Sequence, residues 1–319
     1  MDRETMADKK NTEQFYTRPP KLGKWESFKI FLWNSETNQF LGRTGSSWGK
    51  IILFYLLFYA ALIGFFAAML TVFYQTLDAK QPKWKLNSSL IGSNPGLGFR
   101  PMPPESNVES TLIWYKSSDP DNVAYWVKEL NNFLEGYEAI KTAHANNYQD
   151  CEQGVPPEEG KVCNIEKIRQ VCLPENGFNY NSTDGGPCIF LKLNKIYGWI
   201  PEYYTPANLP DKMPEDLKEH IRKENGTKNA NTVWVTCEGE SPADVENIGP
   251  RNYHPSRGFP GQFFPFKNDE GYVSPFVAVH FEKPRRHVLI NIECKAWAVN
   301  VIHDRADRRG SVHFELMVD

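Results

Sequence analysis

The stretch Trp48–Asp78, WGKIILFYLLFYAALIGFFAAMLTVFYQTLD, decides the fold. It has no charged side chain from Ile51 to Leu77, and about 20 helical residues suffice to cross the hydrocarbon core of a bilayer. Residues 51–73 include fourteen Leu, Ile, Phe or Val side chains, which together favour insertion by about 4 to 8 kcal/mol. A buried helix of a soluble protein is usually shorter and has a polar face. The sequence therefore predicts one transmembrane helix over residues 51–77.

This span divides the chain into unequal parts. About 50 residues with six acidic side chains precede it, which favours a signal anchor over a cleaved signal peptide. We expect residues 1–50 to form a cytoplasmic tail, residues 78–118 an extracellular stem and residues 119–319 a disulfide-bonded ectodomain. The stem prediction follows from five prolines and three glycines in residues 81–105, a composition typical of extended chain.

Cysteines and glycosylation sequons predict the orientation, because the Lys and Arg residues that flank the span are nearly balanced. All six cysteines follow the span, and an even number on one side of a membrane indicates disulfides in an oxidising compartment. Three Asn-X-Ser/Thr sequons lie on the same side. The chain is thus predicted to be a single-pass type II protein with its C-terminus outside the cell. The cysteines are Cys151, Cys163, Cys172, Cys188, Cys237 and Cys294, and the sequon asparagines are Asn87, Asn181 and Asn225.

The part that follows the span has one clear helix and several strands. Asp119 and Pro120 are suited to the start of a helix, and apolar residues recur at helical spacing from Val123 to Ile140. From Cys188 onward, short runs of β-branched and aromatic residues alternate with turn residues. The expected fold class is a single transmembrane α-helix plus an all-β antiparallel sandwich ectodomain with one long helix. The expected strands lie in residues 190–200, 231–239, 274–282, 287–302 and 311–318.

Motifs of catalysis are incomplete. The segment STDGGPC, Ser182–Cys188, is similar to the GDSGGP loop of serine proteases, but Asp184 occupies the place of the nucleophile. The chain has no P-loop, no H-E-x-x-H and no G-x-S-x-G, and its seven histidines lack ligand spacing. We therefore expect no catalytic residue, no metal ligand and no cofactor other than N-linked glycans. We also expect no nucleic-acid partner.

An aromatic loop is a candidate partner site. NYHPSRGFPGQFFPF, residues 252–266, places Phe263, Phe264 and Phe266 among glycines and prolines. Aromatic clusters exposed on loops mark partner sites. The same rings would equally well close an edge of the sandwich, and composition does not distinguish the two.

The transmembrane span itself has the features of a docking surface. Tyr55 and Tyr59 share one helix face, and a phenol in lipid needs a hydrogen-bond partner. Ala60, Gly64 and Ala68 repeat every four residues, a pattern that lets a second helix approach closely. The alternative is a lone anchor that tolerates small residues.

The chain resembles the β subunits of the Na⁺/K⁺- and H⁺/K⁺-transporting P-type ATPases. Residues 28–48, FKIFLWNSETNQFLGRTGSSW, are similar to the cytoplasmic signature of that family, and LFYLLFYAALIGFF is similar to its transmembrane segment. Three later blocks resemble its extracellular part: GGPCIFLKLNKIYGWIP, FFPFKNDEGYVSPFVAVHF and IECKAWAVNVI. The chain departs from the family in LPENG after Cys172, in the FFPF run and in the short Cys151–Cys163 spacing.

The resemblance implies a non-catalytic subunit that binds a catalytic α subunit. Such a subunit helps the α subunit to fold, mature and reach the plasma membrane, and it modulates K⁺ occlusion. The Tyr55/Tyr59 face and the Ala60/Gly64/Ala68 row are matching positions for contacts with membrane helices of the α subunit. The resemblance also implies that the all-β antiparallel sandwich is immunoglobulin-like. It further implies that successive cysteines pair, whereas six cysteines alone allow 15 pairings.

Two other classes share this topology. One is a type II ectoenzyme, which would need a deep polar pocket, and the other is a cell-adhesion protein that acts through its sandwich. The sequence leaves open whether the partner is a sodium or a proton pump and whether a small single-span regulatory subunit joins.

Overall fold

The computed structural model describes residues 23–104, 106, 110–152, 154–165, 170–182, 185–304, 306–307 and 309–319. Two compact units, Met1–Leu77 and Asp78–Asp319, make up the chain. Each unit is described by itself. Residues 1–22 of the predicted cytoplasmic tail lie outside the described residues.

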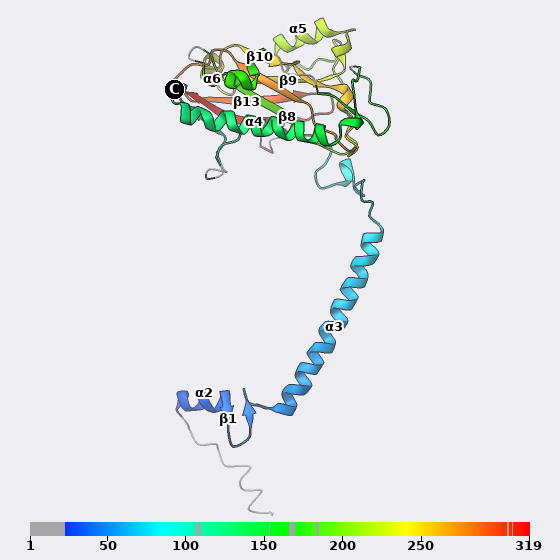
Figure 1. Ribbon diagram of the computed structural model, residues 1–319, viewed down its shortest axis with the longest axis vertical. Helices are drawn as coiled ribbons and strands as arrows, with labels where there is room; N and C mark the ends of the chain where they lie inside the picture. Colours follow the sequence, from blue (N-terminus) through cyan, green and yellow to red (C-terminus); the bar gives the residue numbers. More distant parts are fainter. Residues whose placement is uncertain are drawn as a thin grey trace, which may run out of the picture. The chain divides into compact units, whose positions relative to one another are not determined.

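The first unit has a short helix, a small sheet and a long apolar helix (Figure 1). In the signature segment, the side chain of Asn34 accepts hydrogen bonds from the backbone N–H of Glu36 at 3.0 Å and of Thr37 at 3.3 Å, which forms the turn between the first two strands. The Trp48 indole donates to the Phe40 carbonyl at 2.8 Å and so ties the sheet to the start of the long helix. The elements are α2 (Lys24–Leu32), β1 (Trp33–Asn34), β2 (Gln39–Phe40), β3 (Arg43–Thr44) and α3 (Gly45–Gln75).

Helix α3 is the predicted span. Among the described residues it is the one helix that is long and apolar enough to cross a membrane, and none of its most apolar window is buried by the rest of the chain. It begins earlier than the charge-free run, at Gly45, because the polar residues before Ile51 continue the helix.

The second unit is a sandwich of two sheets, which confirms the predicted fold class. All strand pairs within these sheets are antiparallel except that of β14 with β5. Phe314 of one sheet packs on Phe99 of the other, with ring centroids 5.1 Å apart, in a core that draws on both sheets. The four-stranded sheet has the order β10 (Arg251–His254), β12 (Phe276–Phe281), β8 (Cys188–Leu193) and β4 (Leu97–Arg100). The five-stranded sheet has the order β11 (Gly258–Pro260), β9 (Thr232–Gly239), β13 (Ile290–Trp297), β14 (Ser311–Val318) and β5 (Leu112–Tyr115).

The predicted long helix is α4 (Pro120–Ala143). Asp119 caps it, because its side chain accepts hydrogen bonds from the N–H groups of Asp121 and Asn122. Phe133 packs on Phe190 and Phe276, so the helix covers the outer face of the four-stranded sheet. The apolar stripe faces this sheet except at its end, where Ile140 is 42% exposed.

A second helix, α5 (Glu215–Glu224), covers the outer face of the five-stranded sheet (Figure 1). Alternation along β13 directs Trp297 away from the main core, yet Trp297 is only 3% exposed. It packs with Trp234 against Leu217 and Ile221 of α5, in a small cluster separate from the main core.

The remaining elements are short. A parallel pair, β6 (Tyr148–Gln149) and β7 (Val162–Cys163), lies outside the sandwich. The others are η1 (Leu86–Ser88), η3 (Ala145–Asn147), η4 (Gln170–Cys172), η5 (Pro174–Asn179), η6 (Lys228–Ala230), α6 (Pro242–Asn247) and η7 (Gly261–Phe263).

Candidate partner-binding surfaces

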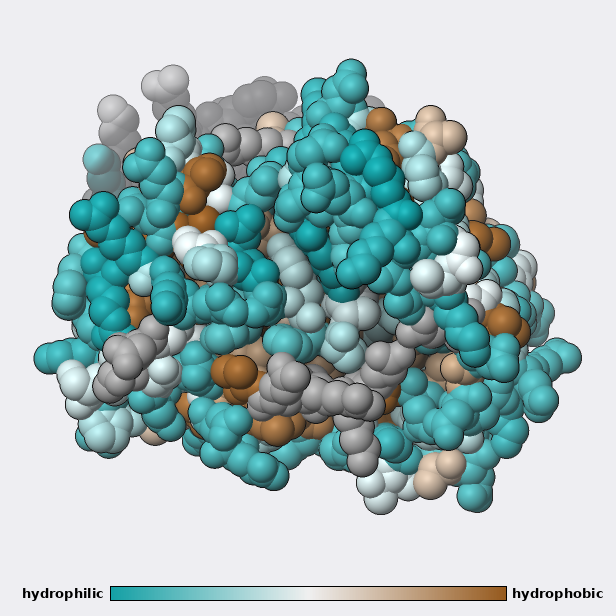
Figure 2. Space-filling model, turned by 90° about the horizontal axis from the view of Figure 1, so that it is seen from above, coloured by the Kyte–Doolittle hydropathy of each residue, from teal (hydrophilic) through white to brown (hydrophobic). Residues whose placement is uncertain are grey.

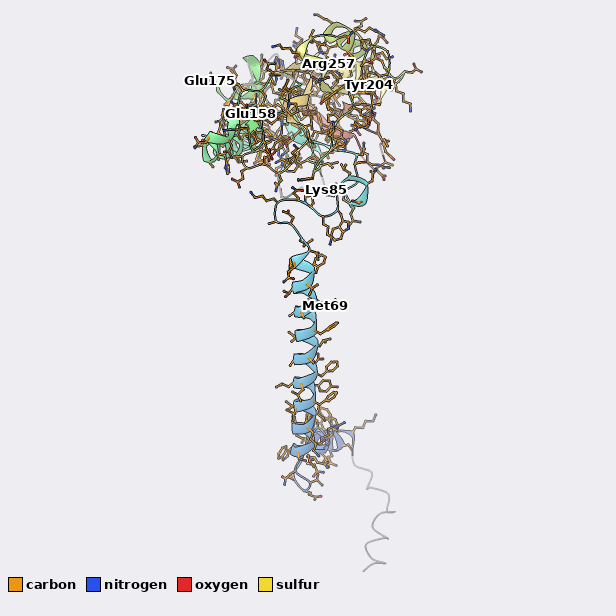
Figure 3. All side chains as sticks on the ribbon, turned by 90° about the vertical axis from the view of Figure 1, so that its right-hand side faces the viewer. Met69, Lys85, Glu158, Glu175, Tyr204 and Arg257 are labelled. Atoms are coloured by element: carbon orange, nitrogen blue, oxygen red, sulfur yellow. A yellow bond between two sulfur atoms is a disulfide. The ribbon has the colours of Figure 1, made fainter. Side chains whose placement is uncertain are left out.

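A ladder of four aromatic rings lines one side of helix α3. Tyr55 stacks on Tyr59 with ring centroids 6.1 Å apart, and Phe54 stacks on Phe58 at the same distance. Each tyrosine also meets its neighbouring phenylalanine edge to face at 5.4 Å. The rings are about half exposed, so they present a broad apolar surface with two phenol groups. The side chains radiate freely from the helix (Figure 3).

The row of small residues lies on the other side of the same helix. At about 100° per residue, the direction of Ala60, Gly64 and Ala68 is about 160° around the axis from that of the two tyrosines. A Cβ atom at Gly64 would meet nothing within 4 Å. The two predicted features therefore form two separate faces, and helix α3 can receive one neighbouring helix on each.

The aromatic loop is mainly an internal support. Phe263 is only 4% exposed, so its prediction as a partner contact is corrected: the ring fills the interior beside η7. Phe264 packs edge to face on Trp199, with ring centroids 5.5 Å apart. Phe266 packs on Tyr197 at 6.2 Å and on Tyr272 at 4.9 Å. Phe264 and Phe266 keep partial exposure, so they remain candidate contacts at the edge of the sandwich.

Two lysines lie over this aromatic group. The Lys195 ammonium is 5.1 Å from the centroid of Phe266 and 5.0 Å from that of Tyr272. The Lys85 ammonium, from the stem, is 4.7 Å from the centroid of Tyr197. Burial, with a smaller effect of nearby Lys192, lowers the pKa of Lys195. The stem is thereby held against the ectodomain by a cation–π contact.

The six cysteines form three disulfides, Cys151–Cys163, Cys172–Cys188 and Cys237–Cys294. This is the pairing of successive cysteines that the family resemblance implies. Cys237 and Cys294 are directly opposed on the neighbouring strands β9 and β13, with Cα atoms 4.0 Å apart. The bond therefore ties strands of one sheet rather than the two sheets.

The three sequon asparagines have exposed side chains. Asn87 lies in η1, Asn225 ends α5 and Asn181 follows η5. Thr183, the last residue of the Asn181 sequon, lies outside the described residues. An exposed asparagine leaves space for a glycan.

A polar cleft of about 580 Å³ between α5 and β10 bears on the ectoenzyme alternative. There Arg257 donates a hydrogen bond to Asp216 at 2.7 Å and lies over the ring of Tyr253, so these two charges neutralise each other. Burial lowers the pKa of His220 beside them.

Figure 2 looks onto the α5 side, where hydrophobic residues are exposed only in small separate groups. Among the described residues, no group of three or more His, Cys, Asp or Glu side chains could hold a metal ion.

Comparison with known proteins shows the family of the chain. The family model described as "Sodium / potassium ATPase beta chain" matches residues 18–314. The chain belongs to this family. It is 51% identical to "Sodium/potassium-transporting ATPase subunit beta-2" of Drosophila melanogaster over 313 residues, which cover 96% of each chain. It is 38% identical to "Sodium/potassium-transporting ATPase subunit beta-1" of the same organism, over 94% of this chain and 95% of the relative. It is 31% identical to "Probable sodium/potassium-transporting ATPase subunit beta-3" of Caenorhabditis briggsae, over 92% of this chain and 87% of the relative.

Membership in the sodium/potassium ATPase β chain family makes this chain an accessory subunit of a cation pump with a single candidate membrane span. The structure shows the geometry of three features of the family resemblance. These are the turn at Asn34, the aromatic ladder of helix α3 and the three disulfides. The exposed aliphatic side chains Leu90 and Ile91 of the stem belong to no motif, so the sequence does not single them out.

Proposed function

We propose that this chain is the non-catalytic β subunit of a Na⁺/K⁺-transporting P-type ATPase and that it acts by binding the catalytic α subunit. The observation that carries the proposal is helix α3, which exposes an aromatic ladder on one side and a row of small residues on the other. Lone anchors need neither feature, whereas packing against other membrane helices uses both. The names of the relatives favour a sodium pump over a proton pump.

The physical role of such a helix is to cover surface of the α subunit. A pump with many spans has polar groups and broken helices inside its bundle, and these are costly when exposed to lipid before assembly. A partner helix that covers them lets the α subunit fold, leave the endoplasmic reticulum and reach the plasma membrane. The disulfide-tied ectodomain then holds extracellular loops of the α subunit and so modulates K⁺ occlusion. The second face of α3 is free for another helix of the α subunit or for a small single-span regulatory subunit.

The proposed orientation is type II, with the ectodomain outside the cell and glycans on Asn87, Asn181 and Asn225. Three disulfides and three exposed sequon asparagines on the same side of the span support it. Digestion of the protein from cell membranes with an N-glycosidase should lower its apparent mass. Three single variants then assign each decrease in apparent mass to one asparagine. They are Asn87→Gln, Asn181→Gln and Asn225→Gln. An unchanged mass would contradict the outside location.

Affinity purification of the full-length chain from membranes in mild detergent tests the partner. We expect a large multi-span α subunit to co-purify in equal amount and to need this chain for its own surface expression. A chain that reaches the cell surface alone and captures no pump subunit would favour an independent adhesion role.

A further inference from the structure

The segment that precedes helix α3 exposes a group of aromatic side chains. Trp25 and Phe28 of helix α2 stack with ring centroids 5.9 Å apart. Trp33 and Phe40 are directly opposed on strands β1 and β2, so they lie on the same face of the small sheet. We call these four residues the N-terminal aromatic group. Their exposed fractions are 68% for Trp25, 48% for Phe28, 59% for Trp33 and 50% for Phe40, and exposed apolar groups of this size mark an interaction surface.

Helix α2 and the small sheet fold together and are attached to the start of α3. The Gly42 N–H donates to the carbonyl of Phe31 at 3.1 Å, which holds the helix against the sheet. The hydrogen bond from the Trp48 indole to the Phe40 carbonyl, at 2.8 Å, then connects the sheet to α3. The rings of Phe40 and Trp48 also lie near each other, with centroids 6.3 Å apart. The N-terminal aromatic group is therefore fixed near the beginning of the predicted span.

The length of α3 places this attachment at the depth of the lipid headgroups. The helix begins at Gly45, and its charge-free run begins at Ile51. At 1.5 Å per residue, these two positions are about 9 Å apart along the helix axis, whereas one headgroup layer of a bilayer is about 5 to 8 Å thick. Trp48 lies within this interval. Its partner Phe40 is therefore close to the hydrocarbon core when α3 spans a membrane.

Helix α2 has one aromatic face with a lysine on each side of it. At about 100° per residue, Trp25, Phe28 and Leu32 fall within an arc of about 60°. Lys24 and Lys29 each lie about 40° outside this arc, at its opposite ends. The Lys29 ammonium is 5.9 Å from the centroid of Trp25. A lysine beside an apolar face keeps its charge at the headgroups while its stem covers apolar surface, so the arrangement suits a helix that lies in the membrane interface.

Charge favours anionic lipid as the ligand. Residues 23–50 have four basic and two acidic side chains, a net charge of +2. The basic side chains are Lys24, Lys29, Arg43 and Lys50, and the acidic ones are Glu26 and Glu36. Glu26 lies about 130° from the centre of the aromatic arc, so its carboxylate is directed away from the two lysines of that face. Each Lys or Arg at the surface of an anionic membrane contributes about 1 kcal/mol to binding.

We infer that helix α2 and the small sheet bind the surface of the membrane that α3 spans. The N-terminal aromatic group lies at the boundary of the hydrocarbon core, and Lys24 and Lys29 contact the headgroups of anionic lipids. Tryptophan favours this depth, because its ring is apolar and its N–H group meets polar headgroups. A soluble protein partner would have to enter the headgroup layer to reach Phe40. The inference goes beyond the proposed function and requires only that α3 spans a membrane.

Spin-label accessibility tests the location of the aromatic face in the full-length chain. All six cysteines form disulfides, so a single introduced cysteine carries the label. Phe28→Cys places the label on the aromatic face. The matched control is Ile30→Cys, because Ile30 is similarly exposed, at 43%, and lies about 170° from the centre of the arc. In vesicles of phosphatidylcholine and phosphatidylserine, we expect a water-soluble nickel complex to reach the Phe28 label several-fold less than the Ile30 label, and oxygen, which concentrates in lipid, to reach it more.

Lysine variants test the contact with anionic lipid. Omission of phosphatidylserine from the vesicles should weaken the protection of the Phe28 label from the nickel complex, and Lys24→Gln/Lys29→Gln should abolish this dependence on phosphatidylserine. The matched control, Lys223→Gln/Lys228→Gln, removes two exposed lysines at the same spacing from the second unit and should retain the dependence. Protection that is the same with and without phosphatidylserine overturns the contact with anionic headgroups.

The remaining outcomes separate this inference from the proposed function. Equal access of the nickel complex to the Phe28 and Ile30 labels overturns the membrane location of the aromatic face. A Phe28 label that both reagents reach in the chain alone, and neither reaches once the α subunit is bound, assigns this face to a protein partner and also overturns the inference. Failure of the α subunit to co-purify overturns the proposed function and leaves the lipid contact standing.

Discussion

Asn94 and Ile302 are joined by a reciprocal pair of hydrogen bonds, with the Asn94 amide acting as donor at 2.8 Å and as acceptor at 2.7 Å. The pair connects the stem to a loop near the C-terminus. A side-chain amide carries both an acceptor oxygen and a donor NH₂ group, so Asn94 satisfies both the N–H and the carbonyl of Ile302. The stem is therefore a fixed part of the ectodomain at this point.

Replacement of Asn94 by alanine should loosen the loop around Ile302. Each hydrogen bond contributes about 0.5 to 1.5 kcal/mol, so loss of both should speed hydrogen exchange of the Ile302 amide by about tenfold or more. Hydrogen–deuterium exchange with mass spectrometry measures the effect. Ser93→Ala is the control, because the Ser93 hydroxyl bonds to Asn87 within the stem. Equal exchange in the two variants would show that the Asn94 amide does not hold the loop.

Substitutions at Gly64 should separate steric contact from helix propensity. Gly64→Ala adds one methyl group to a helical glycine with open space around it and favours the helix by about 1 kcal/mol, whereas Gly64→Leu fills the groove between the small residues. We expect recovery of the α subunit in mild detergent to be kept in Gly64→Ala and to fall several-fold in Gly64→Leu. Unchanged recovery in Gly64→Leu would assign docking to the aromatic face alone. Tyr55→Ala then tests that face.

The disulfide Cys237–Cys294 should be needed for export. Both residues are fully buried in directly opposed positions of β9 and β13. The bond spans 57 residues in sequence, and its loss removes about 4 kcal/mol of stability by loop-closure entropy. Cys237→Ser also leaves a buried thiol next to a hydroxyl. We expect the variant to remain in the endoplasmic reticulum, as measured by surface biotinylation. The double variant Cys237→Ala/Cys294→Ala avoids the free thiol, and its normal surface level would show that the thiol, and not the lost bond, causes retention.

Patterns of hydrophobicity were enough to predict the span from its long charge-free run, helix α4 from its apolar stripe, and the five central strands from their runs of β-branched and aromatic residues. The two outer strands of each sheet have only three or four residues, so β4, β5, β10 and β11 were missed. Helix α5 was missed because only Leu217 and Ile221 of its ten residues are buried.

Some residues of the candidate partner-binding surfaces could likewise be predicted from the sequence, and others could not. Tyr55, Tyr59 and the small residues were predictable, because their spacing fixes a helix face before any tertiary contact forms. Composition could not decide whether Phe263 faces a partner or the interior, since both uses favour the same residue type. The hydrogen bonds between Asn94 and Ile302 depend on contact between segments that are remote in sequence, and asparagine in a loop has many other uses.

Asp244 should make the stability of the ectodomain depend on acidity. Its carboxylate is buried at the start of α6, where it accepts hydrogen bonds from the hydroxyl of Ser241 at 2.7 Å and from the backbone N–H of Asn291 at 3.0 Å. Burial alone raises the pKa of Asp244, but the hydrogen bonds from Ser241 and Asn291 outweigh it, and the pKa lies below its ordinary value. The charged form therefore stabilises the fold by joining α6 to β13.

Asp244→Asn should remove this stabilisation, because an amide cannot accept at both oxygen positions. A lost capping interaction costs about 0.5 to 2 kcal/mol. Since the folded-state pKa is the lower one, the contribution is fully present above the unfolded value of about 3.9 and is lost as the pH falls through the folded-state value. Thermal unfolding of the purified full-length chain should show a lower midpoint for Asp244→Asn at pH 7 and a difference that narrows below about pH 4. Glu246→Gln removes a charge from an exposed position of the same helix and should leave the midpoint within error of the unsubstituted chain. A gap between the Asp244→Asn and unsubstituted midpoints that stays constant into acid would mean that packing, and not the carboxylate charge, joins α6 to the sheet.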